Sequence, residues 1–95
     1  MADEPTTLKL RIEGSVQAVG FRYFTMEEAR KLGLDGWVRN RSDGTVELLV
    51  SGANAGVETF VGLCMRGPPG ARVVNVEMQK ADPPAEKGFH RRASV

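Results

Sequence analysis

Arg22 and Asn40 are the side chains of this sequence whose types and surroundings best suit chemistry on an anion. Arg22 directly follows GSVQAVGF, an uncharged loop at 14–21 that contains two glycines. Consecutive N–H groups of such a loop can form an anion nest, and the N-terminus of a helix behind the loop would strengthen it. A planar guanidinium binds two phosphoryl oxygens at once. The pattern therefore predicts a pocket for a phosphate group.

Neither the loop nor the segment around Asn40 contains a histidine, a cysteine or an acidic residue. The Asn40 amide can orient a water molecule or a phosphate oxygen, but it cannot take a proton at neutral pH. A phosphate ester leaves as an alkoxide and normally needs an acid or a metal, whereas an acyl phosphate leaves as a carboxylate with a pKa of about 4. Phosphoryl transfer depends mainly on positioning and charge stabilisation. These residues therefore favour hydrolysis of an acyl phosphate over hydrolysis of a stable ester.

Each of these features also has a simpler interpretation. The loop could be only a tight connection between a strand and a helix, with Arg22 as a solvated charge at the helix start. Asn40, which precedes RSDG, could begin an Asx-turn. The residue types alone leave these interpretations open, so the elements that position the two segments matter.

Composition and charge indicate one ordinary globular domain. The 95 residues are 41% hydrophobic and 26% charged, with a net charge of +1. This charge balance does not indicate the phosphate attraction of nucleic-acid binders, and there is no long apolar run or secretory leader. Cys64, the single cysteine, cannot form an internal disulfide. We expect a single cytoplasmic domain over 1–95, monomeric, with no nucleic-acid or membrane partner and with residues 1–6 frayed.

Several segments have the alternation typical of strands. In LKLRIEG, the residues Leu8, Leu10 and Ile12 face one way and charged residues face the other. Asp43-Gly44 supplies turn chemistry between two further strands. The predicted strands are LKLRIEG at 8–14, GWVRN at 36–40, TVELLVS at 45–51, ARVVNVEMQ at 71–79 with Val74, Val76 and Met78 alternating, and a short end strand within FHRRASV at 89–95.

YFTMEEARKLG at 23–33 has acidic residues early and basic residues late, which suits a helix dipole. Gly33 followed by Leu34 indicates a Schellman-type end. The start is open: Thr25 with Glu28 fits a capping box, which would begin the helix after Thr25. We favour a start near Arg22, because a helix N-terminus directly behind the loop would make an anion site.

A second helix is predicted from Asn54, because apolar residues recur at i, i+3, i+4, i+7 and i+8. They are Val57, Phe60, Val61, Cys64 and Met65. GPPG at 67–70 stops this helix. On this stripe Cys64 is interpreted as a buried small hydrophobe and not as a nucleophile.

The order β-α-β-β-α-β predicts a ferredoxin-like α+β fold. It is a four-stranded antiparallel sheet with both helices on one face, here with a short C-terminal strand in addition. The first two strands run parallel with the third between them, so their C-terminal ends lie at the same end of the sheet. Two strand spacings, roughly 10 Å, separate these ends. Arg22 and Asn40 should therefore meet around one small cavity.

At these residues the sequence resembles the acylphosphatase family. The matching motifs are GSVQAVGFRYF at 14–24, LGLDGWVRNRSDGTVEL at 32–48, GPPGARVVNV at 67–76 and GF at 88–89. The resemblance implies a ferredoxin-like enzyme that hydrolyses small-molecule acyl phosphates without a metal or cofactor. It also implies that Arg22 is the phosphate-binding catalytic arginine and that Asn40 orients the attacking water. The phosphate cradle would be the backbone amides of Val16, Gln17, Ala18, Val19, Gly20 and Phe21.

Ala18 departs from the family pattern, which usually reads Val-Gln-Gly-Val. If this position needs a positive φ, alanine costs on the order of 1 kcal/mol or shifts the loop.

Two rival functions are a phosphate-binding module with little or no turnover and a reader of single-stranded RNA. The first occurs when this kind of domain forms part of larger maturation enzymes, and the absence of further domains here favours a free-standing enzyme. The second needs exposed aromatic residues on the central strands. The exposed positions predicted there, Lys9, Arg11, Glu13, Glu47, Leu49 and Ser51, offer none.

Overall fold

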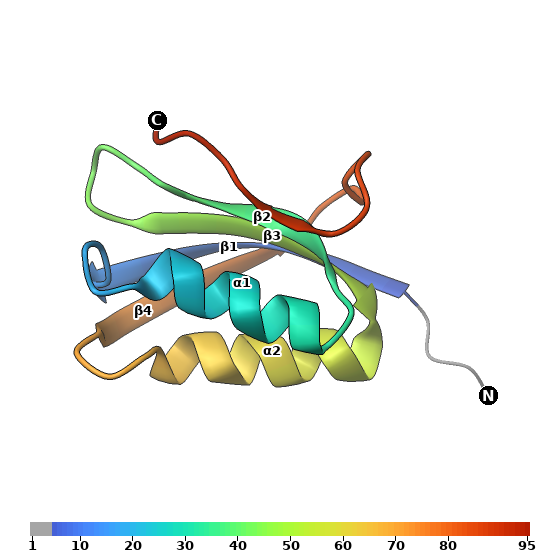
Figure 1. The fold of residues 1–95 in the computed structure, drawn as a ribbon, viewed down its shortest axis with the longest axis horizontal. Coiled ribbons are helices and arrows are strands. Elements are labelled where there is room, and N and C mark those ends of the chain that lie inside the picture. The colour runs from blue at the N-terminus through green and yellow to red at the C-terminus, as the bar shows by residue number, and fades with distance from the viewer. Residues whose placement is uncertain (1–4) are drawn as a thin grey trace.

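A computed structural model describes residues 5–95 as one sheet with two helices packed on one of its faces (Figure 1). This is the predicted ferredoxin-like α+β fold. Within residues 5–95, neither helix has the length and hydropathy needed to cross a membrane. The elements are β1 (Pro5–Ser15), α1 (Phe21–Lys31), β2 (Asp35–Asn40), β3 (Val46–Ala53), α2 (Asn54–Arg66), β4 (Arg72–Lys80) and β5 (Phe89–Arg91).

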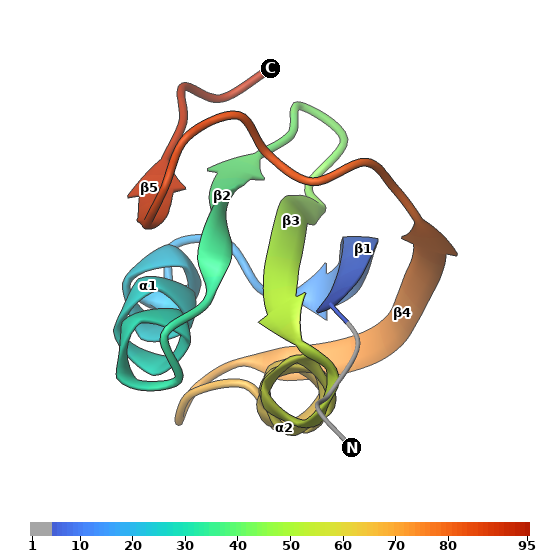
Figure 2. The same ribbon diagram turned by 90° about the vertical axis from the view of Figure 1, so that its right-hand side faces the viewer.

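The five strands lie in the order β4-β1-β3-β2-β5. The antiparallel pairs β1–β3 and β2–β3 place β3 between β1 and β2, which therefore run parallel, as expected. β5 pairs parallel with β2, so the sheet is mixed, and the short C-terminal strand extends it at the edge (Figure 2). β2 would otherwise present an unpaired edge to solvent, and β5 covers part of it.

The core lies between the sheet and the helices. Leu10, Leu48 and Phe60 are fully buried, and the Phe60 and Phe89 rings lie 5.8 Å apart between centroids. Burial raises the pKa of the Cys64 thiol, which is consistent with its interpretation as a buried hydrophobe. The buried cluster consists of Leu10, Ile12, Val16, Phe21, Ala29, Leu34, Val38, Val46, Leu48, Val50, Val57, Phe60, Cys64 and Phe89.

α1 begins at Phe21, with Gly20 as its N-cap. The preferred start near Arg22 is therefore confirmed, and the helix N-terminus lies directly behind the loop. Thr25 does not cap the helix: it is buried, and its hydroxyl donates a hydrogen bond of 2.8 Å to the Arg22 carbonyl. The capping-box alternative is wrong because Thr25 already lies inside the first turns.

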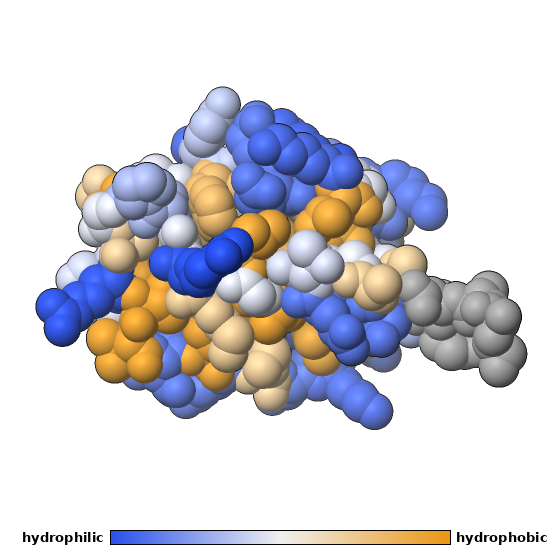
Figure 3. All heavy atoms as spheres, turned by 90° about the horizontal axis from the view of Figure 1, so that it is seen from below, coloured by the Kyte–Doolittle hydropathy of each residue, from blue (hydrophilic) through white to orange (hydrophobic). Residues whose placement is uncertain are grey.

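The predicted helix ends are present. The Leu34 N–H donates to the Ala29 carbonyl at 2.9 Å, and Gly33 has a φ of 69°, as a Schellman end requires. α2 begins at Asn54 as predicted. Met65, which the apolar stripe includes, is 51% exposed because it lies at the edge of that stripe. Figure 3 shows hydrophobic residues among hydrophilic ones on the face seen from the helix side.

The first strand begins earlier than predicted. Pro5 and Thr6 belong to β1 and pair with Ala53 and Gly52 of β3. The expected fraying of residues 1–6 therefore does not hold for these two, because the longer β3 provides partners for them. Residues 1–4 lie outside the described part of the chain.

A bulge in β4, where Val74 has no partner on β1, changes which valine of this strand faces the core. The pairing between β1 and β4 shifts register between Glu13 and Gly14. As a result Val73 packs against the core, while Val74 is 73% exposed. The predicted alternation of Val74 with Val76 and Met78 is therefore wrong at Val74, because one residue of slip reverses the face on which a side chain lies.

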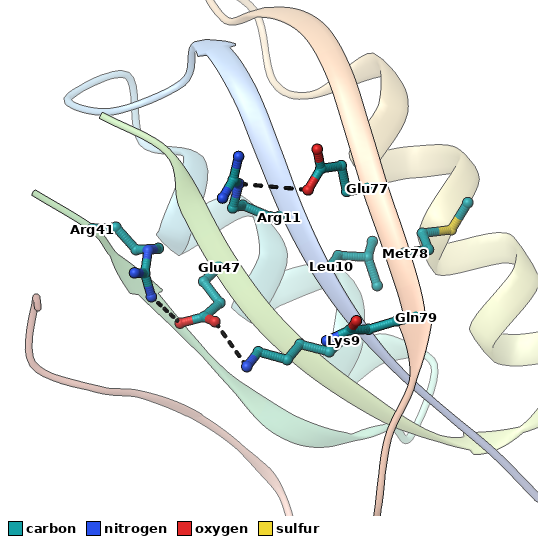
Figure 4. Close-up of a pocket in the computed structure, with 8 residues that line it drawn as sticks. All are labelled: Lys9, Leu10, Arg11, Arg41, Glu47, Glu77, Met78 and Gln79. Carbon is teal, nitrogen blue, oxygen red and sulfur yellow. Dashed lines mark hydrogen bonds and ion pairs between the residues drawn. The ribbon is translucent and has the colours of Figure 1, made fainter. Parts of the chain in front are cut away.

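The face of the sheet opposite the helices carries a charged cluster around Glu47, which is 5% exposed. Its carboxylate accepts hydrogen bonds from Arg39 at 2.8 Å and Arg41 at 3.2 Å, and it pairs with Lys9 at 3.1 Å. Figure 4 shows the contacts with Arg41 and Lys9. Burial alone would raise the pKa of Glu47, but the hydrogen bonds from Arg39 and Lys9 outweigh it and lower the pKa below its ordinary value of 4.5.

This shift predicts a pH-dependent contribution of Glu47 to stability. Because the pKa is lower in the folded protein, the contribution is complete above pH 4.5 and is lost as the pH falls through the folded-state pKa. Urea unfolding should show Glu47→Gln as destabilised at about pH 6.5, with the difference from wild type shrinking toward about pH 3. A difference that stays constant over this range would contradict the assignment. Glu86→Gln, at an exposed position, is the matched control.

Candidate active site

The β1–α1 loop and the C-terminal end of β2 lie together at one end of the molecule, on the left in Figure 1. Between them is a small pocket with a volume of about 130 Å³. Parallel alignment of β1 and β2 brings Arg22 and Asn40 to this common end. The residues that line the pocket are Val16, Ala18, Gly20, Phe21, Arg22, Tyr23, Asn40 and Arg91.

Gln17 attaches the loop to the turn between β2 and β3. Its side-chain amide donates hydrogen bonds to the carbonyls of Arg41, at 2.8 Å, and Thr45, at 2.9 Å. These carbonyls belong to the turn that directly follows Asn40. The side chain of Gln17 therefore points away from the pocket and fixes the distance between the loop and Asn40.

This attachment predicts that Gln17→Ala weakens both the fold and anion binding. Removing the amide leaves two turn carbonyls without these donors, so the free energy of unfolding should fall by about 1–2 kcal/mol. Inorganic phosphate, measured as a competitive inhibitor, should bind less tightly because the loop can move away from Asn40. Gln79→Ala, on the exposed surface of β4, should change neither quantity. An unchanged inhibition constant in Gln17→Ala would contradict the proposed role of the attachment.

The loop conformation leaves its N–H groups available to a ligand. Ala18 has a φ of 61° and Gly20 a φ of 76°, so both adopt left-handed conformations. Successive N–H groups in such a loop turn toward one side, as in an anion nest. Within residues 5–95, none of the backbone N–H groups from Val16 to Tyr23 donates a hydrogen bond to the protein. Val19 packs its side chain against the core and contributes only its backbone to the loop.

The positive φ at Ala18 is the condition under which alanine was expected to cost about 1 kcal/mol. Ala18 keeps the left-handed conformation despite this cost. We expect Ala18→Gly to raise the free energy of unfolding by up to about 1 kcal/mol, reduced by the greater freedom of glycine in the unfolded chain. Turnover should not fall, because the amides are already in place. Ala18→Val introduces a branched side chain at a positive φ and should lower the free energy of unfolding relative to wild type. A free energy of unfolding equal to or higher than that of wild type would contradict the proposal that the backbone at Ala18 is strained.

Arg22 lies in the first turn of α1 and is half-buried. Among the described residues it makes no ion pair and no side-chain hydrogen bond to the protein. The described residues that line the pocket include no carboxylate. The pocket therefore concentrates positive charge, together with the N-terminal end of a helix dipole.

Asn40 contributes an unpaired acceptor to the same end of the molecule. Its Oδ1 atom is buried and has no hydrogen-bond partner within residues 5–95. The Asx-turn interpretation of Asn40 is wrong, because Asn40 Oδ1 accepts no hydrogen bond within residues 5–95 and the Ser42 N–H donates to the Val95 carbonyl instead. Asp43 makes this kind of contact: its Oδ1 accepts from the N–H of Thr45 at 3.0 Å and from the Thr45 hydroxyl at 2.6 Å. A buried amide oxygen without a partner is costly. A hydrogen-bond donor placed at this position would satisfy it.

Two residues of the pocket, Tyr23 and Arg91, were not predicted from the sequence. Tyr23 follows Arg22 on α1 and is 69% exposed, so it lies at the mouth of the pocket. Arg91 comes from β5, where the parallel register pairs it with Val38 of β2. The end strand predicted within 89–95 includes Arg91. The sequence did not reveal that this strand pairs with β2, or in which register, and so did not place Arg91 at the pocket.

A larger hollow of about 440 Å³ lies over the face of the sheet opposite the helices (Figure 4). Its cations already have partners: Lys9 and Arg41 pair with Glu47, and Arg11 approaches Glu77 at 3.8 Å. Mixed charges neutralise each other there, so this hollow is less suited to an anion than the pocket at Arg22.

The fold and the pocket together define a small α+β protein with a site suited to an anion. Within the described part of the chain, no three or more His, Cys, Asp or Glu residues are grouped so that they could hold a metal ion. The polar groups of the pocket are the guanidinium groups of Arg22 and Arg91, the Tyr23 hydroxyl, backbone amides and the Asn40 carboxamide.

Comparison with known proteins gives the family. The family model described as acylphosphatase matches residues 8–91. The acylphosphatase of Acidiphilium cryptum is 51% identical over 85 residues, which cover 90% of this chain and 93% of that protein. The crystal structure of the acylphosphatase from Bacillus subtilis has a TM-score of 0.88 at 33% identity and covers 94% of this chain and 99% of that one. The chain belongs to the acylphosphatase family.

A further structural neighbour is much longer than this chain. Full-length HypF, in its phosphate- and nucleotide-bound form, has a TM-score of 0.89 at 26% identity. The similarity covers 99% of this chain but only 12% of HypF. The same fold therefore also occurs as one part of a large protein.

Proposed function

We propose that this pocket hydrolyses acyl phosphates to a carboxylate and orthophosphate, with Arg22 and the loop amides binding the phosphoryl group and Asn40 orienting the attacking water. Hydrolysis of acyl phosphates is the activity that the family relationship supports. The observation that supports the assignment of residues is the shared pocket. It joins the Arg22 guanidinium, the loop N–H groups and Asn40 Oδ1, none of which has a partner within residues 5–95.

Binding of the phosphoryl group is assigned to the positive end of the pocket. The guanidinium of Arg22 can hold two phosphoryl oxygens, and the N–H groups from Val16 to Phe21 can hold the remaining lone pairs. As the bond to the leaving group breaks, the negative charge is redistributed over the phosphoryl oxygens. Donors fixed in advance by the loop and helix can stabilise that charge without rearranging.

The attacking water is assigned to Asn40. Its carboxamide oxygen can accept one hydrogen bond from the water and so direct an oxygen lone pair toward phosphorus. No base is required for a loose transition state, in which the water forms little bond to phosphorus before the leaving group departs. The proton of the water is lost after attack, to solvent or to the phosphate itself.

Independence from metal ions follows in this proposal from the leaving group. A carboxylate with a pKa of about 4 departs without a proton donor or a Lewis acid. A phosphate ester lacks this advantage, and none of the described residues that line the pocket has a carboxyl, imidazole or thiol group that could protonate its alkoxide. The proposal therefore restricts the substrates to mixed anhydrides of a carboxylic acid and phosphoric acid.

Phosphate release from benzoyl phosphate and from phenyl phosphate, both in the presence of a chelator, tests this proposal. The two compounds share the phosphoryl group and the ring but differ in the leaving group. We expect turnover of benzoyl phosphate, undiminished by the chelator, and no measurable turnover of phenyl phosphate. Comparable hydrolysis of both, or loss of benzoyl phosphate hydrolysis with the chelator, would contradict it.

A binding module without turnover is the second candidate, and the similarity to a small part of HypF favours considering it. Such a module would bind inorganic phosphate but release none from benzoyl phosphate. The RNA-reading alternative is less compatible with the sheet surface. Trp37, an aromatic residue on the face opposite the helices, is only 9% exposed, and the guanidiniums of Arg39 and Arg92 each lie 4.8 Å from its ring. It is therefore not free for base stacking.

We further propose that the protein acts as a cytoplasmic monomer. A free, buried Cys64 is compatible with a reducing compartment, although it does not require one. An elution volume in size-exclusion chromatography that corresponds to 10.3 kDa would support the monomer, and one near twice that mass would contradict it.

A further inference from the structure

Arg91 and Arg92 are adjacent in sequence but lie on opposite faces of the sheet. Arg91 pairs with Val38 of β2, whose buried side chain faces the helices, and it lines the pocket together with Asn40. Arg92 instead lies over the Trp37 ring on the other face, with 4.8 Å between its guanidinium carbon and the ring centroid. Alternation along an extended chain accounts for this difference.

The direction of β5 brings Arg91 to the pocket. Because β5 runs parallel to β2, it advances from the end of the sheet at Gly36 toward the end at Asn40. The buried Phe89 fixes the face of β5, and Arg91, two residues later, points to that same face nearer the pocket. Figure 2 shows β5 beside β2 on the side of the sheet where α1 lies.

The pocket thus holds a second guanidinium that its walls do not neutralise. Among the described residues Arg91 makes no ion pair or side-chain hydrogen bond, and no carboxylate lines the pocket. Arg91 is exposed, whereas Arg22 is half-buried at the helix start. Arg22 and the loop amides already provide enough donors for the phosphoryl oxygens. Because Arg91 is exposed and still lines the pocket, its positive charge lies at the pocket mouth. The acyl part of a bound substrate would extend there.

We propose that Arg91 is a specificity-determining residue that binds a second anionic group on the acyl part of the substrate. This inference rests on the proposed function of the pocket and names its substrate class: acyl phosphates whose acyl part carries a carboxylate or a second phosphate. A planar guanidinium suits either anion, since both present paired oxygens.

The test compares benzoyl phosphate with 4-carboxybenzoyl phosphate, which adds one carboxylate at the far end of the same ring. The quantity measured is the ratio of kcat/KM for the carboxylated substrate to kcat/KM for benzoyl phosphate. In Arg91→Gln this ratio should fall about tenfold relative to wild type, mainly through KM, as expected for loss of one charge-assisted contact. In Arg92→Gln, which removes the same charge from the neighbouring residue on the other face, the ratio should not change.

The outcomes separate this inference from the proposed function. If the wild type hydrolyses benzoyl phosphate but the ratio is the same in wild type and Arg91→Gln, Arg91 does not select the acyl part, and only this inference is overturned. Equal falls in Arg91→Gln and Arg92→Gln would assign the effect to overall charge and would overturn it as well. If the wild type hydrolyses neither substrate, the proposed function fails and the inference fails with it. Circular dichroism and urea unfolding establish that both variants are folded.

Discussion

Replacing Arg22 by alanine should lower kcat/KM for benzoyl phosphate by about 10³-fold or more, the effect of removing a guanidinium that holds a transferring phosphoryl group. The pocket would retain its loop amides but lose its most deeply placed cation. Arg22→Lys should recover only part of the activity, because an ammonium keeps the charge but cannot bind two oxygens in a fixed geometry. Steady-state kinetics of the three proteins, with and without inorganic phosphate as inhibitor, measure the effect.

The control for this variant is Lys31→Ala. Lys31 lies at the other end of α1, is exposed and forms only a surface ion pair of 3.5 Å with Glu28. The Lys31→Ala substitution removes the same unit of charge from the same helix as Arg22→Ala. It should leave kcat/KM within about twofold of the wild-type value, because an exposed ion pair of this kind contributes little. The account would fail if Arg22→Ala were folded and as active as Lys31→Ala.

Asn40→Ala should lower kcat by about 10²-fold while the affinity for inorganic phosphate changes little, because the amide is assigned to the water and not to the phosphoryl group. Stability should respond in the opposite direction. A buried acceptor without a partner costs about 1–3 kcal/mol, so removing Asn40 Oδ1 should leave the free energy of unfolding unchanged or slightly higher. Kinetics and urea unfolding on the same preparations measure both effects.

Asn75→Ala provides the comparison for Asn40. Asn75 is exposed on β4, where its amide makes a long contact of 3.4 Å with Glu13, and its loss should affect neither kcat nor stability appreciably. A large loss of stability in Asn40→Ala would show that Asn40 has a structural role. A loss of phosphate affinity equal to the loss of kcat would assign the amide to the phosphoryl group.

The meeting of Arg22 and Asn40 could be predicted from sequence because it depends on topology. Strict alternation over Leu8, Leu10 and Ile12 identifies the first strand, and the order of elements then makes β1 and β2 parallel around β3. Any arrangement with that order brings the ends of β1 and β2 to the same side. The start of α1 near Arg22 was favoured for a different reason, because a helix N-terminus directly behind the loop would make an anion site.

The register of the edge strands could not be predicted, because it depends on contacts with distant residues. Gly14 lies at the bulge, and a Cβ there would collide with the Arg72 carbonyl oxygen of β4. Nothing in the sequence of β4 indicates that Val73, and not Val74, must then face the core. Likewise, a strand of only three residues has too little pattern to reveal that it pairs parallel with β2, which is the fact that places Arg91 in the pocket.

The role of Gln17 shows a third limit. As a loop residue it was expected to contribute only a backbone amide, but its side chain attaches the loop to the carbonyls of Arg41 and Thr45. A long polar side chain in a loop can reach many partners, and its choice depends on where the neighbouring turn lies. The structure supplies that position.

The measurement that tests the central claim most directly is hydrolysis of benzoyl phosphate by the wild-type protein in ¹⁸O-labelled water with a chelator present. Water directed at phosphorus breaks the bond between phosphorus and the bridging oxygen, so the account predicts that one labelled oxygen appears in orthophosphate and none in benzoate. Label in benzoate would mean that water attacks the acyl carbon, and it would contradict the roles assigned to Arg22, the loop amides and Asn40.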